Sequence, residues 1–231
     1  MKPGQTFHHV ASLGALMTLL FTAHATLAQM PGTRVPGGCD VLASKRTGET
    51  GCYLLATESL KRLPAKEVFW HLYAYPSRVA AEAARKGSAG TVVESLGKIW
   101  LFTIAGSNWR PPAGDRVAVI GPLPDVTDKS YTARYMEAVF PPRQVMQTSV
   151  HQHSGPEAWY VVTGAQCLRT PEDVLVIRAG EGGFVRPGPS MLLTSIGTET
   201  RRAVLLVLHD ASQPWMTITS DWTPTTQCPE A

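Results

Sequence analysis

Residues 148–164, TSVHQHSGPEAWYVVTG, constrain the fold of this chain more than any other segment. His151 and His153 are two residues apart, so on a β-strand both side chains project from the same face. The Ser-Gly-Pro sequence that follows is typical of a turn, which ends this strand and reverses the chain. Glu157 then opens the apolar run AWYVV. The stretch therefore predicts two antiparallel strands that bring a carboxylate beside two imidazoles.

This arrangement predicts a metal site formed by His151, His153 and Glu157. On one strand the Cβ atoms of the two histidines lie about 6–7 Å apart, a separation that a single ion can bridge. Two neutral nitrogens and one carboxylate suit Fe(II), Mn(II), Ni(II) or Zn(II). Alternation along the second strand turns Glu157, Trp159 and Val161 inward, so the ligands are expected to face an apolar and aromatic pocket.

The spacing His-x-His, three residues, Glu, six residues, Gly resembles the first sequence motif of the cupin superfamily. The matching residues are His151, His153, Glu157 and Gly164, complete in type and spacing. The resemblance extends over roughly the last hundred residues of the sequence. It implies a small antiparallel, jelly-roll-like β-barrel with a metal bound inside, a small-molecule ligand or substrate, and a homodimer as one assembly.

The second cupin motif, which contributes a fourth ligand, is matched only in part by residues 180–195. Both glycines of the motif are in place, but the proline comes one position late. Met191 stands where the motif has its histidine, and Ser195 where it has its asparagine. Because a thioether prefers Cu(I), we interpret Met191 as a wall of the pocket. The metal then keeps three protein ligands and an open side, as catalysis requires.

His209 is the other histidine of the barrel half and ends the apolar run 202–208. Alternation along that run turns it inward. We predict a catalytic role for His209, as the missing fourth ligand or as a general acid/base. The alternative is a histidine hydrogen-bonded to a backbone group at the end of its strand.

Residues 1–28 have the composition of a secretory signal peptide. Lys2 is the single fixed charge, residues 10–20 are apolar, and small residues lead up to Ala28. The apolar part is shorter than the about 20 residues that a membrane-spanning helix needs. We expect cleavage after Ala28, with Ala25 as a second site, and a periplasmic or secreted protein with no membrane segment after cleavage.

Four cysteines follow the predicted leader, and an even number in an oxidising compartment predicts two disulfide bonds. We favour Cys39–Cys52, which closes a short N-terminal loop, and Cys167–Cys228, which attaches the C-terminal tail to the barrel. The other two pairings and free buried thiols stay open as alternatives.

The chain is therefore expected to be mainly β, with an N-terminal strand-rich α+β elaboration and a C-terminal cupin-type barrel. The elaboration, residues 29–128, contains one short helix over 78–86 with Ser77 as its N-cap. The barrel occupies residues 129–213, and residues 214–231 form a tail whose tryptophans fold onto it.

Two classes of function remain open. The first is a metal-dependent oxygenase, isomerase or lyase that acts on a small organic molecule. The second is a non-catalytic cupin that binds a small molecule or a metal and has lost the fourth ligand. A net charge of +3 without a run of basic residues argues against a nucleic-acid partner.

Overall fold

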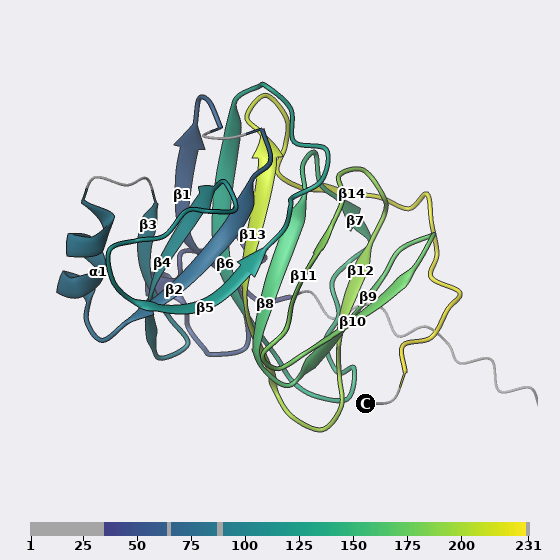
Figure 1. Cartoon of the computed structure of the whole chain (residues 1–231). Coiled ribbons are helices and arrows are strands. Elements are labelled where there is room, and N and C mark those ends of the chain that lie inside the picture. The colour runs from purple at the N-terminus through teal and green to yellow at the C-terminus, as the bar shows by residue number, and fades with distance from the viewer. Residues whose placement is uncertain (1–34, 64–65, 87–89, 230–231) are drawn as a thin grey trace, which may run out of the picture. The chain divides into compact units, whose positions relative to one another are not determined.

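The computed structural model describes residues 35–63, 66–86 and 90–229 (Figure 1). The predicted signal peptide lies outside these residues. The described elements are the strands β1 (Gly51–Leu60), β2 (Phe69–Tyr75), β3 (Thr91–Ser95), β4 (Lys98–Ala105), β5 (Asp115–Ile120), β6 (Tyr131–Phe140), β7 (His151–Gln152), β8 (Glu157–Thr163), β9 (Ala165–Arg169), β10 (Val174–Arg178), β11 (Gly182–Val185), β12 (Leu192–Ile196), β13 (Arg201–Asp210) and β14 (Thr217–Ile218), the helix α1 (Arg78–Arg85) and a short 3-10 turn, Ala43–Lys45.

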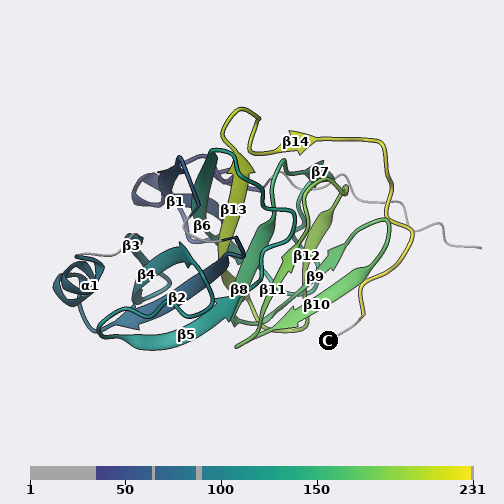
Figure 2. The same ribbon diagram turned by 45° about the horizontal axis from the view of Figure 1, so that its top comes forward.

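A five-stranded antiparallel sheet with the order β1-β6-β13-β8-β11 forms the centre of the fold. The β10-β9-β12 sheet and the β14-β7 pair complete a barrel on one side of it (Figure 2). A four-stranded sheet with the order β3-β4-β2-β5 packs on the other side, together with α1. The chain is thus mainly β with one short helix, and the fold class predicted from the sequence is confirmed.

The central sheet is buried on both faces, as β13 illustrates. The residues that pack inside the barrel are Ala203, Leu205 and Val207. The residues between them that pack toward the four-stranded sheet are Val204, Leu206 and Leu208. A strand that alternates between two apolar environments must be apolar throughout, which explains the uninterrupted hydrophobic run of β13. On β8 the same alternation places Trp159 and Val161 inside the barrel, as predicted.

Strand β1 connects the two halves of the chain. It precedes the expected start of the barrel, yet it pairs with β6 over its whole length, with an irregularity between Leu54 and Ala56. β6 begins at Tyr131 and is followed along the chain by the other strands of the barrel. The N-terminal half and the barrel therefore share one sheet and one core, while the division of the chain at residue 128 stays a prediction.

Helix α1 begins where the sequence predicts it. The Ser77 hydroxyl accepts a hydrogen bond from the Ala80 backbone N–H at 3.2 Å, and Ala81 and Ala84 are the residues of the helix that are buried.

Replacing Ser77 by alanine is expected to lower the free energy of unfolding by about 1 kcal/mol, because one N–H of the first helical turn loses its acceptor. Urea unfolding followed by circular dichroism measures the change. An unchanged midpoint would show that the cap does not contribute to stability.

Both predicted disulfide bonds are present. Cys39–Cys52 ties the N-terminal segment to β1, and Cys167–Cys228 ties the C-terminal tail to β9. Disulfides of this kind fit a periplasmic or extracellular protein. Across residues 35–63, 66–86 and 90–229, none of the helices has the length and hydrophobicity needed to cross a membrane.

Candidate metal centre

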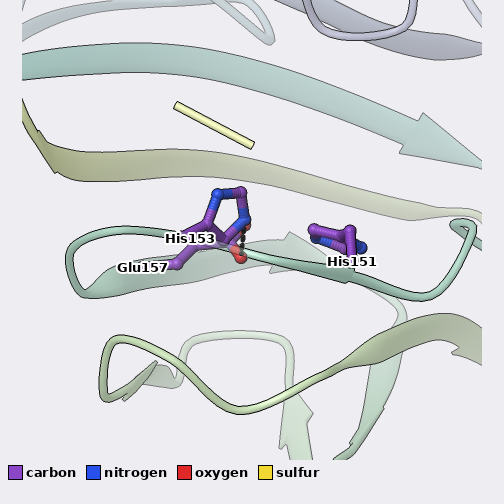
Figure 3. Close-up of side chains that lie close together, drawn as sticks. All are labelled: His151, His153 and Glu157. Carbon is purple, nitrogen blue, oxygen red and sulfur yellow. Dashed lines mark ion pairs between the residues drawn. The ribbon is translucent and has the colours of Figure 1, made fainter. Parts of the chain in front are cut away.

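The structure brings together the three residues that the sequence predicts as metal ligands. His151 lies on β7, where its backbone N–H and carbonyl pair with the carbonyl and N–H of Met191 at 3.0 and 2.8 Å. His153 follows just after β7, and Glu157 is the first residue of β8 (Figure 3). The three residues are 6%, 4% and 6% exposed, so all three are buried.

The strand that carries the histidines is shorter than expected. The sequence predicts one strand that carries both histidines, but only His151–Gln152 forms β7, and His153 follows after its end. The segment before it turns sharply, with positive φ angles of 58° and 59° at Arg143 and Gln144. The convergence of the two imidazoles therefore depends on the short pairing of β7 with Met191 and β14, rather than on a long regular strand.

One ligand atom from each of the three residues lies within 4.8 Å of the others. The imidazole rings of His151 and His153 are 4.9 Å apart between centroids, and His153 Nε2 lies 3.1 Å from Glu157 Oε2. Nitrogen and oxygen ligands bind ions such as Zn²⁺ at about 2.0–2.2 Å. The observed spacing is therefore close to what ligands of one ion need.

Backbone carbonyls fix the tautomer of both histidines. His151 Nδ1 lies 2.8 Å from the Ser149 carbonyl oxygen, and His153 Nδ1 lies 2.6 Å from that of Trp215. A carbonyl oxygen only accepts hydrogen bonds, so each Nδ1 must carry the hydrogen and donate it. Each Nε2 then keeps its lone pair. This support of a histidine ligand by a backbone carbonyl is common in metal sites.

Electrostatics also keep His151 neutral. Burial lowers the pKa of the His151 imidazole, and the neighbouring His153 lowers it further, against an opposing effect of the Glu157 carboxylate. A neutral imidazole is the form that binds a metal.

The three residues fit a divalent ion. His153 Nε2 and Glu157 Oε2 face each other at 3.1 Å, yet neither has a hydrogen-bond partner among the described residues. Both atoms are acceptors once His153 Nδ1 holds the hydrogen. Two buried acceptors at this distance repel each other unless a cation or a proton lies between them. The set of two imidazoles and one carboxylate provides the ligands for that cation.

The C-terminal tail supplies part of the site. The Trp215 indole stacks on the His153 ring at 5.7 Å with an interplanar angle of 22°, and the Arg134 guanidinium lies 4.5 Å from the Trp215 ring. The pairing of β14 with β7 holds this segment in place. The sequence predicts that the tail folds onto the barrel, but the contact of the Trp215 carbonyl with a ligand is not predicted.

A cavity of about 780 Å³ opens beside the three ligands. Its walls are mainly apolar, with Met136, Ala138, Phe140, Leu193 and Leu205 from the barrel, and its lining also includes residues 35–41 and parts of the tail. Arg201 lines the same cavity and was not predicted as a site residue.

Met191 is 1% exposed and packs in the barrel core with Met136, Phe140 and Leu205, which line the cavity. Its backbone pairs with that of His151. The interpretation of Met191 as a wall of the pocket stays a prediction.

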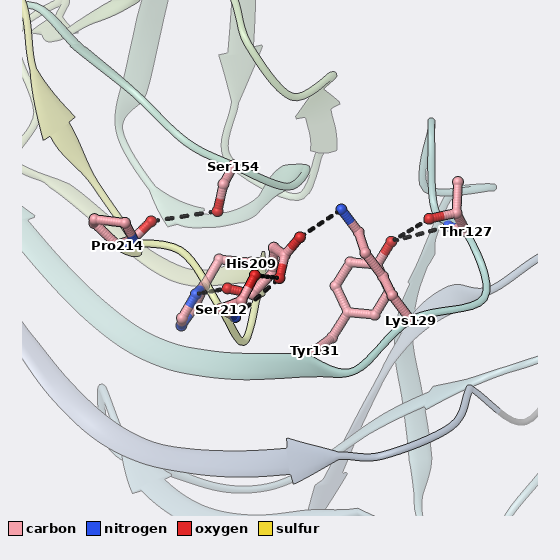
Figure 4. A network of polar contacts seen from close by, with 8 residues as sticks. Thr127, Lys129, Tyr131, Ser154, His209, Ser212 and Pro214 are labelled. Carbon is pink, nitrogen blue, oxygen red and sulfur yellow. Dashed lines mark hydrogen bonds and ion pairs between the residues drawn. The ribbon is translucent and has the colours of Figure 1, made fainter.

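His209 lies outside the group of three ligands. It is 8% exposed, and its Nδ1 donates a hydrogen bond to the Asp210 carbonyl at 2.9 Å (Figure 4). Burial lowers the pKa of the His209 imidazole, which keeps it neutral. The residue is not among those that line the cavity. The backbone hydrogen bond matches the alternative given for a histidine at a strand end, and the catalytic role of His209 stays a prediction.

Neither a protein-family model nor a curated protein matches this sequence. Solved structures do match part of this chain. A cupin superfamily protein from Desulfitobacterium hafniense is 9% identical with a TM-score of 0.31, and the match covers 34% of this chain and 68% of that one. A cupin-like protein from Thermotoga maritima is 14% identical with a TM-score of 0.34 and coverages of 38% and 64%. A DMSP lyase from Ruegeria pomeroyi is 15% identical with a TM-score of 0.32 and coverages of 38% and 43%, so less than half of that lyase is matched.

These partial matches say nothing about the activity of this chain. The fold follows from its own strand pairing and buried residues. The antiparallel barrel, the buried His151, His153 and Glu157, and the tight turn at Gly164 between β8 and β9 are the features that the first cupin motif implies. The C-terminal part of this chain therefore has the fold of a cupin-type antiparallel β-barrel.

Proposed function

We propose that this chain is an exported metalloprotein whose barrel holds one divalent ion, Fe, Mn, Ni or Zn, on His151, His153 and Glu157. The observation that supports this most directly is the buried group of acceptors without a donor, in which His153 Nε2 faces Glu157 Oε2 at 3.1 Å. Export to the periplasm or the cell exterior is supported by the two disulfide bonds.

The cavity beside the ligands favours a small organic molecule as the partner. Its volume of about 780 Å³ and its mainly apolar walls are typical of a small-molecule site. The carbonyls of Ser149 and Trp215 orient the two imidazoles toward one point. A bound ion would supply polarisation of a substrate oxygen or activation of water or dioxygen. We therefore favour an oxygenase, isomerase or lyase reaction.

A non-catalytic binding function is the second candidate. Met191 stands where the second cupin motif has its histidine, and its side chain packs in the apolar barrel core. The ion then has three protein ligands, which suffices to bind a small molecule without any reaction.

Metal analysis of the purified protein tests the proposal. After dialysis against Fe(II), Mn(II), Ni(II) or Zn(II), we expect about one ion per chain by mass spectrometry. Glu157→Gln should reduce the metal content to background, because the carboxylate supplies the negative charge of the ligand set. Glu172→Gln is the matched control, since Glu172 lies at the surface and pairs with Arg186. Equal metal content in wild type and Glu157→Gln would contradict the proposal.

A further inference from the structure

Arg201 is a buried cation inside the barrel. It is the first residue of β13 and pairs in register with Phe140 of β6, so its side chain shares the interior face of the sheet with the Phe140 ring. Its exposed fraction is 0%, and it lines the same cavity as His151, His153 and Glu157. A fully buried arginine is rare unless it has a partner of opposite charge.

The polar contacts of Arg201 leave one end of its guanidinium free. Nε donates a hydrogen bond to Gln166 Oε1 at 2.7 Å, and the group lies 5.2 Å from the centre of the Phe140 ring. Both terminal nitrogens, NH1 and NH2, are buried without an acceptor among the described residues. Burial lowers the pKa of the Arg201 guanidinium to about 9, which still leaves the group protonated at neutral pH.

Among the described residues, no acidic group of the cavity forms an ion pair with Arg201, although the Glu157 carboxylate raises the pKa of the Arg201 guanidinium against the effect of burial. Two carboxylates line the cavity, those of Asp40 and Glu157. Asp40 pairs with Arg134 at 2.8 Å, and Glu157 lies beside His153. None of the ion pairs among the described residues includes Arg201. With a divalent ion on the three ligands, the charges of the ion, Glu157 and Arg201 sum to a positive cavity, which favours an anion.

We propose that Arg201 binds the carboxylate of a small organic acid that occupies the cavity beside the metal ligands. This rests on the proposed function, because it names the substrate or ligand class of the same site. The free NH1 and NH2 form a planar pair of donors that matches the two oxygens of a carboxylate. Gln166 fixes the plane of the guanidinium by accepting from Nε. The apolar walls then receive the hydrocarbon part of the acid.

The apolar walls argue for an organic acid over an inorganic anion. Met136, Ala138 and Leu205 provide no hydrogen bonds from their side chains, so most oxygens of an inorganic anion such as phosphate would face apolar groups without a donor. A monocarboxylate balances the charge of Arg201 and places its apolar body against these side chains. Its other end can then reach the metal ligands.

Matched pairs of acids and amides test this inference. We would titrate phenylacetate against phenylacetamide, and hexanoate against hexanamide, into the metal-loaded and the chelator-treated protein, using calorimetry and ligand-observed NMR. Each acid is expected to bind at least about 30-fold more tightly than its amide, because the amide lacks the charge that pairs with the buried guanidinium. The preference should persist in the chelator-treated protein.

Arg201→Met should abolish the preference for acids, whereas Arg202→Gln should retain it. Arg202 is the neighbouring residue of β13, but it is part-exposed and pairs with Glu49. Arg201→Lys keeps the charge without the planar pair of donors and should weaken acid binding only in part. Should Arg201→Met fail to fold, the comparison of acid with amide in the wild type still decides the question.

Three results would overturn the inference: equal affinity for acid and amide, no binding of either acid at millimolar concentration, or a preference that survives Arg201→Met. Metal content measured on the same samples separates this inference from the proposed function. Protein without metal that still prefers acids through Arg201 would contradict the proposed function alone. Protein with metal but no preference dependent on Arg201 would contradict this inference alone.

Discussion

Replacing Gly155 by alanine is expected to destabilise the protein by about 3 kcal/mol or more and to displace Glu157 from the two histidines. Gly155 lies in the turn between His153 and Glu157, and β13 passes directly against it. A Cβ at this position would lie 2.8 Å from the Leu208 carbonyl carbon and 2.9 Å from the His209 Cα. These are backbone atoms of a buried strand, so they cannot move aside as the end of a flexible side chain could.

Two other glycines provide controls for this substitution. Gly48→Ala should be nearly neutral, since Gly48 has no atom within 4 Å of the added Cβ. Gly180→Ala also has free space but a φ of +84°, so it should cost about 1–2 kcal/mol from backbone strain alone. Chemical unfolding measures all three, and metal analysis should show a loss in Gly155→Ala only. A Gly155→Ala protein with wild-type stability and metal content would contradict the account of this turn.

The grouping of the three candidate ligands could be predicted from the sequence because they are close together along the chain. His151, His153 and Glu157 lie within seven consecutive residues, and one turn is enough to bring them together. The need for a glycine at position 164 also follows from the turn in which it lies. Gly164 has a φ of +68° in the turn between β8 and β9, and a Cβ there would meet the Thr200 carbonyl and the Arg201 backbone within 2.9 Å.

The contacts that the sequence did not reveal are long-range. The Trp215 carbonyl reaches His153 across 62 residues, through the pairing of β14 with β7. The membership of β1 in the central sheet likewise depends on its pairing with β6, which no local pattern encodes.

Arg201 did leave a signal in the sequence. The alternation that turns His209 inward along β13 also turns Leu205 and Arg201 inward, since these residues are separated by even intervals. A lone arginine at an interior position of an apolar strand predicts either a buried ion pair or an anionic ligand. The distinction between the two needs the structure, in which NH1 and NH2 have no acceptor among the described residues.

Removing the Cys167–Cys228 disulfide should lower stability while leaving the metal centre intact. The bond spans 61 residues, and the entropy model for a loop of that length gives about 4 kcal/mol, or a fall in Tm of about 8–16 °C. Alanine is the better replacement at both positions, because Cys167 is 0% and Cys228 is 8% exposed and a serine hydroxyl would be buried. The metal content should not change, since the pairing of β14 with β7 still holds Trp215 beside His153.

The Cys39–Cys52 bond gives the matched comparison. It spans 13 residues, so the same model predicts a smaller loss of about 3 kcal/mol for its double alanine variant. Residues 35–41 and Cys52 line the cavity, however, so this variant should also bind organic acids more weakly, whereas the Cys167–Cys228 variant should not. Differential scanning calorimetry and acid titrations on both variants measure the two effects. If the Cys167–Cys228 variant also lost its metal, the disulfide and not β14 would position His153.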